Sequence, residues 1–129
     1  RVRVGLGTDI GGGTDFCHLA TLNEAYKVLQ LQKQSLGAFR GFYLATLGSA
    51  RSLYLDHQIG SLEVGKEADF VVLDLAATEL MKDRLFMSQD LYEILFALMM
   101  LGDDRCIKET YAAGECVYDY ESDHYGCQK

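Results

Sequence analysis

The sequence contains no proline, no internal repeat and no low-complexity tract, so no flexible linker is evident. Its longest strongly hydrophobic stretch, residues 94–101, is far shorter than the ~20 residues that a helix needs to cross a bilayer. The N-terminus also has no basic segment followed by a hydrophobic one, as a signal peptide would have. These absences argue against a membrane protein and against a secreted one.

Cysteine and positive charge are both scarce. The four cysteines form no CxxC motif, so a reducing cytoplasm is the simplest location. Twelve basic side chains against nineteen acidic ones give a formal net charge of −7, which would repel nucleic-acid phosphates and anionic lipid head groups. We therefore expect neither nucleic acid nor a membrane surface as a partner.

What is present is the composition of a soluble globular domain. The 129 residues are 49% hydrophobic and 24% charged, within the ordinary range. The first residue is Arg1 rather than Met, and Val2, Val4 and Leu6 alternate with arginine and glycine, which predicts a strand at once. A chain that begins inside such an element suggests a fragment, a processed product or a truncated gene model.

Hydrophobic spacing predicts two helices in the first half of the chain. The first runs toward residue 34, with an open start because Thr21 and Glu24 also fit a capping box. Ser35 is the expected N-cap of the second, whose hydrophobic positions continue at i, i+3, i+4 and i+7 as far as Leu53.

The second half predicts a third helix and three strands. Asp90 caps a helix over about 90–101, which is expected to bury Leu91, Ile94, Leu95 and Leu98. The hydrophobic run 69–74 predicts a buried, central strand, and strands on either side of Ala113-Gly114 predict a hairpin beside it. We place a boundary near Asp56, and residues 121–129 are expected to fray.

Asp9 is the principal candidate for chemistry. It ends the predicted first strand, and Gly11, Gly12 and Gly13 follow it. Catalytic groups gather at the carboxyl ends of strands in α/β folds, where a carboxylate can bind a metal ion or accept a proton from metal-bound water. An Asx turn, or a cap on the following helix, explains the same pattern equally well.

Other catalytic motifs are absent. The three histidines, His18, His57 and His124, lie far apart and form neither HxH nor HExxH. No GxSxG elbow for acyl transfer occurs, and Ile10 stands where a dinucleotide-binding GxGxxG would need its last glycine.

Two segments resemble the amidohydrolase superfamily. Residues 4–14, VGLGTDIGGGT, are similar to its motif on the eighth barrel strand, and residues 65–74, GKEADFVVLD, are similar to its C-terminal GKxADxVxLD signature. Within the superfamily, residues 24–28, 42–48 and 95–105 resemble guanine deaminases. The resemblance extends to about Tyr118.

This resemblance implies an α/β fold: the C-terminal end of a (β/α)8 metal-dependent hydrolase barrel, incomplete in this chain, plus a small β-rich domain. Residues 1–55 would be the last barrel strand with its following helices. Residues 56–129 would be mostly the small domain, with an interposed helix at about 90–101. Such enzymes hold Zn2+ with an HxH pair, two further histidines and an aspartate, and only the aspartate, Asp9, has a counterpart here.

The implied reaction is the hydrolysis of guanine to xanthine and ammonia by a cytoplasmic homodimer, with Asp9 as both metal ligand and catalytic base. The histidine ligands and the residues that read the purine would lie on earlier strands, so this chain alone is expected to be inactive. Two alternatives stay open. One is another amidohydrolase deaminase acting on a different ring, and the other is a non-catalytic interaction or oligomerisation fragment with exposed apolar surface.

Overall fold

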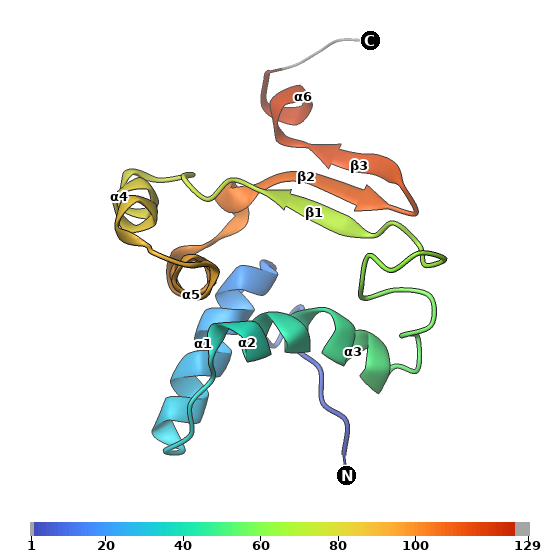
Figure 1. The fold of residues 1–129 in the computed structure, drawn as a ribbon, viewed down its shortest axis with the longest axis horizontal. Coiled ribbons are helices and arrows are strands. Elements are labelled where there is room, and N and C mark those ends of the chain that lie inside the picture. The colour runs from blue at the N-terminus through green and yellow to red at the C-terminus, as the bar shows by residue number, and fades with distance from the viewer. Residues whose placement is uncertain (1, 126–129) are drawn as a thin grey trace.

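The computed structural model describes residues 2–125, and it places a group of helices beside a three-stranded antiparallel sheet (Figure 1). The helices are α1 (His18–Leu31), α2 (Ala38–Ala45), α3 (Leu47–Ser52), α4 (Glu79–Met87), α5 (Leu91–Leu101) and α6 (Tyr120–Tyr125). The strands are β1 (Phe70–Leu73), β2 (Ile107–Ala112) and β3 (Glu115–Asp119), and a 3-10 turn, η1 (Asp104–Cys106), precedes β2.

The N-terminal segment is not a strand, so the predicted first strand is wrong for the described chain. Residues 2–9 are irregular, and the Leu6 N–H donates to Leu44 O at 3.2 Å and to Ser49 Oγ at 3.1 Å. A strand needs a neighbouring strand to accept its backbone hydrogen bonds. Here the junction between α2 and α3 accepts the Leu6 N–H instead.

Helix α1 confirms the first predicted helix and settles its start. It begins at His18, and the Cys17 N–H before it donates to Asp15 Oδ1 at 2.6 Å. The capping box at Thr21 is therefore not used. After the helix, Lys33 adopts a φ of +58° and the Gln34 N–H donates to Leu29 O at 2.9 Å, a left-handed ending of the kind that closes many helices.

The second predicted helix is two helices, and it begins later than Ser35. Gly37 is the N-cap of α2, and Thr46 interrupts the helix with a φ of −123° and a ψ of −103°. The Thr46 hydroxyl donates to Phe42 O at 2.7 Å, and threonine back-bonding of this kind bends helices. Phe39 and Leu53, at the two ends of the predicted hydrophobic pattern, are exposed.

Helix α5 packs against three other helices, α1, α2 and α4. As predicted, Asp90 Oδ1 caps it by accepting the Glu93 N–H at 2.9 Å, and Gly102 follows its last turn. The predicted buried face is partly wrong, because Leu91 is 60% exposed while Ala97, Leu98 and Met99 are buried. Almost every residue of α5 is hydrophobic, so the spacing of these residues did not single out one buried face of the helix.

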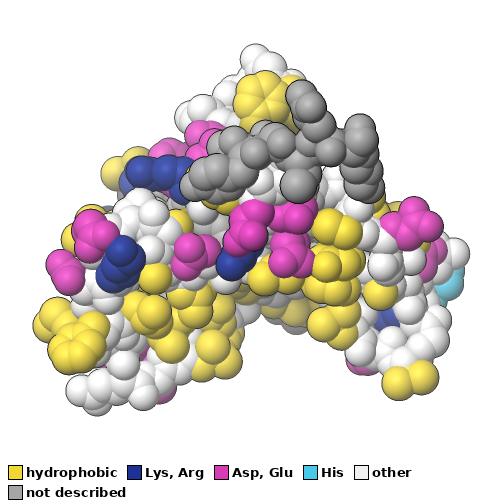
Figure 2. Space-filling view, turned by 90° about the horizontal axis from the view of Figure 1, so that it is seen from above, with side chains coloured by type: hydrophobic (Ala, Val, Ile, Leu, Met, Phe, Trp, Pro, Cys, Tyr) yellow, Lys and Arg dark blue, Asp and Glu magenta, His cyan; other side chains and the backbone are white. Residues whose placement is uncertain are grey.

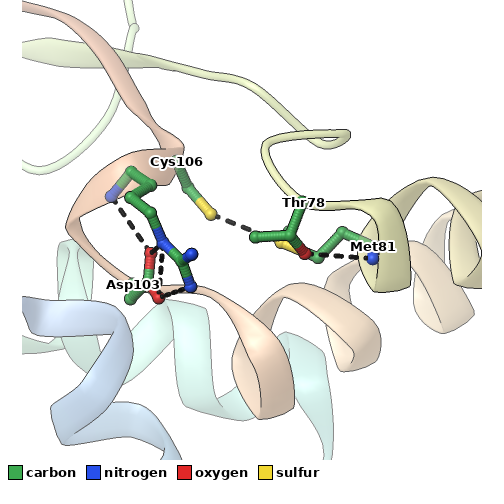
Figure 3. Close-up of polar contacts among 5 residues, drawn as sticks. Thr78, Met81, Asp103 and Cys106 are labelled. Carbon is green, nitrogen blue, oxygen red and sulfur yellow. Dashed lines mark hydrogen bonds and ion pairs between the residues drawn. The ribbon is translucent and has the colours of Figure 1, made fainter.

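The core joins α1, α4, α5 and η1. Its buried residues are Leu19, Leu22, Met81, Leu98, Met99 and Cys106. Helix α4, which the hydrophobic spacing did not predict, is capped by the Thr78 hydroxyl, which accepts the Met81 N–H at 3.2 Å (Figure 3). Burial of Met81 then holds α4 against α5.

The sheet has the order β1-β2-β3, with both pairs antiparallel. The strand predicted at 69–74 and the hairpin at Ala113-Gly114 are confirmed. The strand is not central, however, because β2 lies between β1 and β3, and Val71 on β1 is 49% exposed. A continuous hydrophobic run indicates a strand but not its position in the sheet.

The end of the chain and its surface complete the fold. Residues 120–125 form α6 instead of fraying, and residues 126–129 lie outside the described chain. Within residues 2–125, no helix has the length and hydrophobicity to cross a membrane. Many large hydrophobic side chains are exposed, Val2, Val64 and Phe86 among the most fully, and Figure 2 shows hydrophobic groups across one face of the molecule.

Candidate functional site

Asp9 lies in the tight turn that follows the N-terminal segment. Its backbone has a φ of +50°, and its carbonyl oxygen accepts the N–H of Gly12 at 2.8 Å and the N–H of Gly13 at 2.6 Å. Aspartate is among the few residues other than glycine that adopt this left-handed region. The backbone of Asp9 therefore closes the turn, and its carboxylate is not needed for that purpose.

The carboxylate of Asp9 is exposed and has no structural partner among residues 2–125. Neither a hydrogen bond nor an ion pair to its oxygens occurs in that part of the chain, whereas Asp15 Oδ1 accepts the N–H of Cys17 before α1. Asp15, two residues after Gly13, thus makes the Asx-type contact that the sequence also allowed for Asp9. Asp9 does not cap the helix.

The glycines after Asp9 meet two different steric demands. A Cβ atom built on Gly13 would lie 1.8 Å from Thr8 O, which is a backbone collision. A Cβ atom built on Gly12 would lie 2.8 Å from Asp9 Oδ2, which is a side-chain collision. The backbone of the turn thus requires glycine at Gly13, whereas the absence of a side chain at Gly12 leaves room for the Asp9 carboxylate.

The described residues do not by themselves form a metal site. No group of three or more His, Cys, Asp or Glu side chains that could hold a metal ion occurs within residues 2–125. The histidine nearest in sequence, His18, directs its Nε2 to within 3.3 Å of Leu6 O. A zinc site typically needs three or four protein ligands, so Asp9 could supply only one ligand of a larger set.

Asp69 and Asp74, which flank β1, hold backbone. Asp69 Oδ1 accepts the N–H of Ala113 at 2.8 Å and so ties the start of β1 to the hairpin. Asp74 Oδ1 accepts the N–H of Ala76 at 2.8 Å and forms a turn after the strand. Both carboxylates are therefore structural.

An apolar groove lies between the helices and the sheet. This groove, of about 470 Å3, is predominantly apolar and is lined by residues that include His18, Leu22, Phe42, Phe70 and Tyr111. Sequence reasoning did not identify it, because its lining comes from α1, α2, β1 and β2, and only the hydrophobic character of each segment could have signalled it. The groove can bury apolar surface, but its lining suggests no catalytic constellation.

One hydrogen-bonded pair on the sheet shifts the pKa of a tyrosine. Tyr111, stacked on Phe70 with ring centroids 4.5 Å apart, donates its phenolic hydrogen to Glu109 Oε2 at 2.7 Å. The acceptor and its negative charge raise the pKa of Tyr111 to about 12. This pair stabilises the neutral phenol and does not prepare it as an acid near neutral pH.

Comparison with known proteins identifies the family. The sequence model of the family described as "Amidohydrolase family" matches residues 1–117, which are nearly the whole of the described chain. The chain therefore belongs to the amidohydrolase family. The match includes the Asp9 turn, β1 and the hairpin.

Individual deaminases of known sequence or structure are similar to this chain. A guanine deaminase from Escherichia coli strain K12 is 57% identical over 119 residues, which are 92% of this chain and 27% of that protein. The solved structure of E. coli guanine deaminase matches with a TM-score of 0.89 at 58% identity, over 92% of this chain and 28% of that one. An adenosine deaminase from Xanthomonas campestris with bound zinc matches with a TM-score of 0.63 at 28% identity, over 78% of this chain and 22% of that one. The chain thus spans between 22% and 28% of the length of these relatives.

Proposed function

We propose that the complete protein containing this chain is a guanine deaminase, which hydrolyses guanine to xanthine and ammonia. The observation that carries the proposal is the 57% identity to the E. coli guanine deaminase, over 92% of this chain. The chain would form the C-terminal part of this proposed guanine deaminase. Because it spans only 27% of that relative, most of the active site would come from the rest of the protein.

Asp9 is the residue of this chain that we assign to the chemistry. Its carboxylate is exposed and lacks a structural partner within residues 2–125, so it is available to a reacting molecule. It would accept a proton from the attacking water and help to pass it to the departing amino group. The residues that orient the guanine ring would lie outside this chain.

A metal ion is part of the proposal. A bound metal ion supplies a strongly acidified water, whose pKa can fall to about 7. Asp9 would be one of its ligands, and the other ligands would come from the rest of the protein. The zinc bound to the X. campestris adenosine deaminase supports Zn2+ as the metal. The homodimer and the cytoplasmic location implied by the family resemblance stay predictions.

The architecture of the complete protein is also a proposal. Residues 1–55 would join a (β/α)8 barrel as its last strand and following helices, and residues 56–129 would belong mostly to a small β-rich domain. In a barrel, residues 2–6 would gain neighbouring strands to accept their hydrogen bonds. The exposed hydrophobic side chains at Val2 and Val4 support additional protein beside this segment.

The test is a deaminase assay on the complete protein, expressed from its whole reading frame with Zn2+. We expect xanthine to appear from guanine, followed by ultraviolet absorbance, with turnover on the order of 1 to 1000 per second. The 129-residue chain alone is the matched control, and it should neither form xanthine nor retain zinc after dialysis. Activity on adenine, cytosine or a triazine but not on guanine would replace the proposal with another deaminase. No activity on any of them would favour an interaction fragment instead.

A further inference from the structure

We propose that Gly12 is a positioning residue for Asp9: its missing side chain leaves the space that the Asp9 carboxylate occupies. The catalytic consequence rests on the proposed deaminase function. The geometric part does not, because it concerns only the turn that residues 8–13 form.

The turn fixes Asp9 from two sides. On the backbone side, the N–H groups of Gly12 and Gly13 both donate to Asp9 O, at 2.8 and 2.6 Å, and these bonds hold Asp9 at its φ of +50°. On the side-chain side, Asp9 Oδ2 folds back over Gly12, within 2.8 Å of the position that a Cβ atom would take there. Gly12 thus donates a hydrogen bond to the backbone of Asp9 and also leaves room for the Asp9 carboxylate.

A side chain at Gly12 would move the carboxylate and leave the backbone in place. The Cβ contact at Gly12 is with Asp9 Oδ2, whereas ordinary van der Waals contacts of a Cβ atom begin at 3.4 Å. Oδ2 is the free end of a rotatable side chain, so it must shift by several tenths of an ångström while the main chain stays. Gly13 differs, because its Cβ would meet Thr8 O at 1.8 Å and would disrupt the turn itself.

Small displacements of a catalytic group are costly. A misplacement of ~1 Å can reduce the rate by about a hundredfold. We therefore expect Gly12→Ala to lower kcat by roughly ten- to a hundredfold through the position of Asp9. The change should have little effect on KM, because Gly12 itself would not bind the substrate.

The experiment compares Gly12→Ala with two other substitutions in the complete protein. Gly37→Ala is the matched control, since Gly37 has a φ of −71° and its Cβ would lie 3.3 Å from the flexible Tyr92 hydroxyl. It should retain the wild-type kcat. Gly13→Ala should lower the thermal midpoint of unfolding, whereas Gly12→Ala should leave that midpoint close to the wild-type value. A large fall in the midpoint for Gly12→Ala would overturn the proposal, because the methyl group would then act on the backbone.

Two further measurements test the link to Asp9 directly. A crystal structure of Gly12→Ala should show Asp9 Oδ2 displaced and the two hydrogen bonds to Asp9 O intact, and an unmoved carboxylate would refute the positioning role. In a double-mutant cycle, Gly12→Ala should lower kcat in the wild-type background but not in Asp9→Asn. An equal loss in both backgrounds would likewise refute it. If the wild-type protein does not deaminate guanine, the proposed function fails, and the crystal structure still decides whether Gly12 positions the carboxylate.

Discussion

Cys106 Sγ lies 3.6 Å from Met81 Sδ, and this contact connects the turn before β2 to helix α4 (Figure 3). Both residues are buried: Cys106 is 0% exposed and Met81 is 4% exposed. Residues 25 positions apart are thereby joined in the same core as α1 and α5. The contact links the sheet to the helices, which the sequence alone gave no reason to expect.

Replacing Cys106 by serine should destabilise the protein. The hydroxyl would be buried beside a thioether, without a good partner, and burying an unpaired hydroxyl costs about 1 to 3 kcal/mol in proteins. Cys116→Ser is the matched control, because Cys116 is exposed, and it should leave the free energy of unfolding nearly unchanged. Urea unfolding of both variants measures the two changes in the free energy of unfolding. Equal changes would mean that the side chain of Cys106 is not shielded from water.

Burial also raises the pKa of the Cys106 thiol, so less of the reactive thiolate is present at neutral pH. An alkylating reagent should therefore modify Cys116 in the folded protein and Cys106 only on unfolding. Mass spectrometry of peptides at successive times would show the order of modification. Early labelling of Cys106 would contradict the buried environment described here.

Helix α5 offers a test of which face is buried. Leu98 is 1% exposed and Leu91 is 60% exposed. Leu98→Ala should reduce the free energy of unfolding by about 2 to 5 kcal/mol, as truncation of buried leucines does, while Leu91→Ala should cost well under ~1 kcal/mol. Thermal and urea unfolding of the two variants measure the difference. A loss at Leu91 as large as that at Leu98 would restore the face that hydrophobic spacing predicted, which contains both residues.

Tyr111 should titrate later than a free tyrosine. Its pKa is raised to about 12 by the hydrogen bond to Glu109 and by that residue's charge. The bond favours the neutral phenol, so the stability it contributes is fully present below about pH 10, the ordinary tyrosine pKa. That stability is lost as the pH rises through about 12.

Ultraviolet absorbance of the phenolate follows this titration. Tyr111→Phe should remove the late step, and Glu109→Gln should bring the pKa of Tyr111 down toward its ordinary value because the negative charge is gone. A late step that persists in Tyr111→Phe would assign it to another tyrosine.

Asp9→Asn tests the assigned catalytic residue in the complete protein. Removing a general base typically lowers the rate by about 10² to 10⁴, and the exposed carboxylate has no structural partner among residues 2–125, so the fold should be unchanged. Asp15→Asn is the control, because an amide oxygen can still accept the Cys17 N–H that Asp15 Oδ1 now holds. Steady-state kinetics with guanine, beside circular dichroism, measure both effects. A wild-type kcat in Asp9→Asn would reject the base role.

Local chemistry in the sequence determined several features of this protein. Asp90 predicted the start of α5, because an aspartate before a hydrophobic helical segment accepts an N–H of the first turn. Two strand-like segments on either side of Ala113-Gly114 predicted the hairpin, and in the structure these two turn residues adopt positive φ, +50° and +83°. Asp9 was identified by its place before three glycines and by the family resemblance, and its catalytic and metal-binding roles stay predictions.

Only the tertiary structure decided which partner each segment meets. Alternation at Val2, Val4 and Leu6 predicted a strand, but a strand forms only where another strand accepts its hydrogen bonds. In this chain Leu44 and Ser49 accept the Leu6 N–H instead. The same reason explains why β1 lies at an edge and why Leu91 is exposed: a sequence pattern states what a segment can bury, whereas its neighbours decide what it does bury. The close approach of Asp9 Oδ2 to Gly12 likewise depends on how the turn folds back, which composition and spacing do not specify.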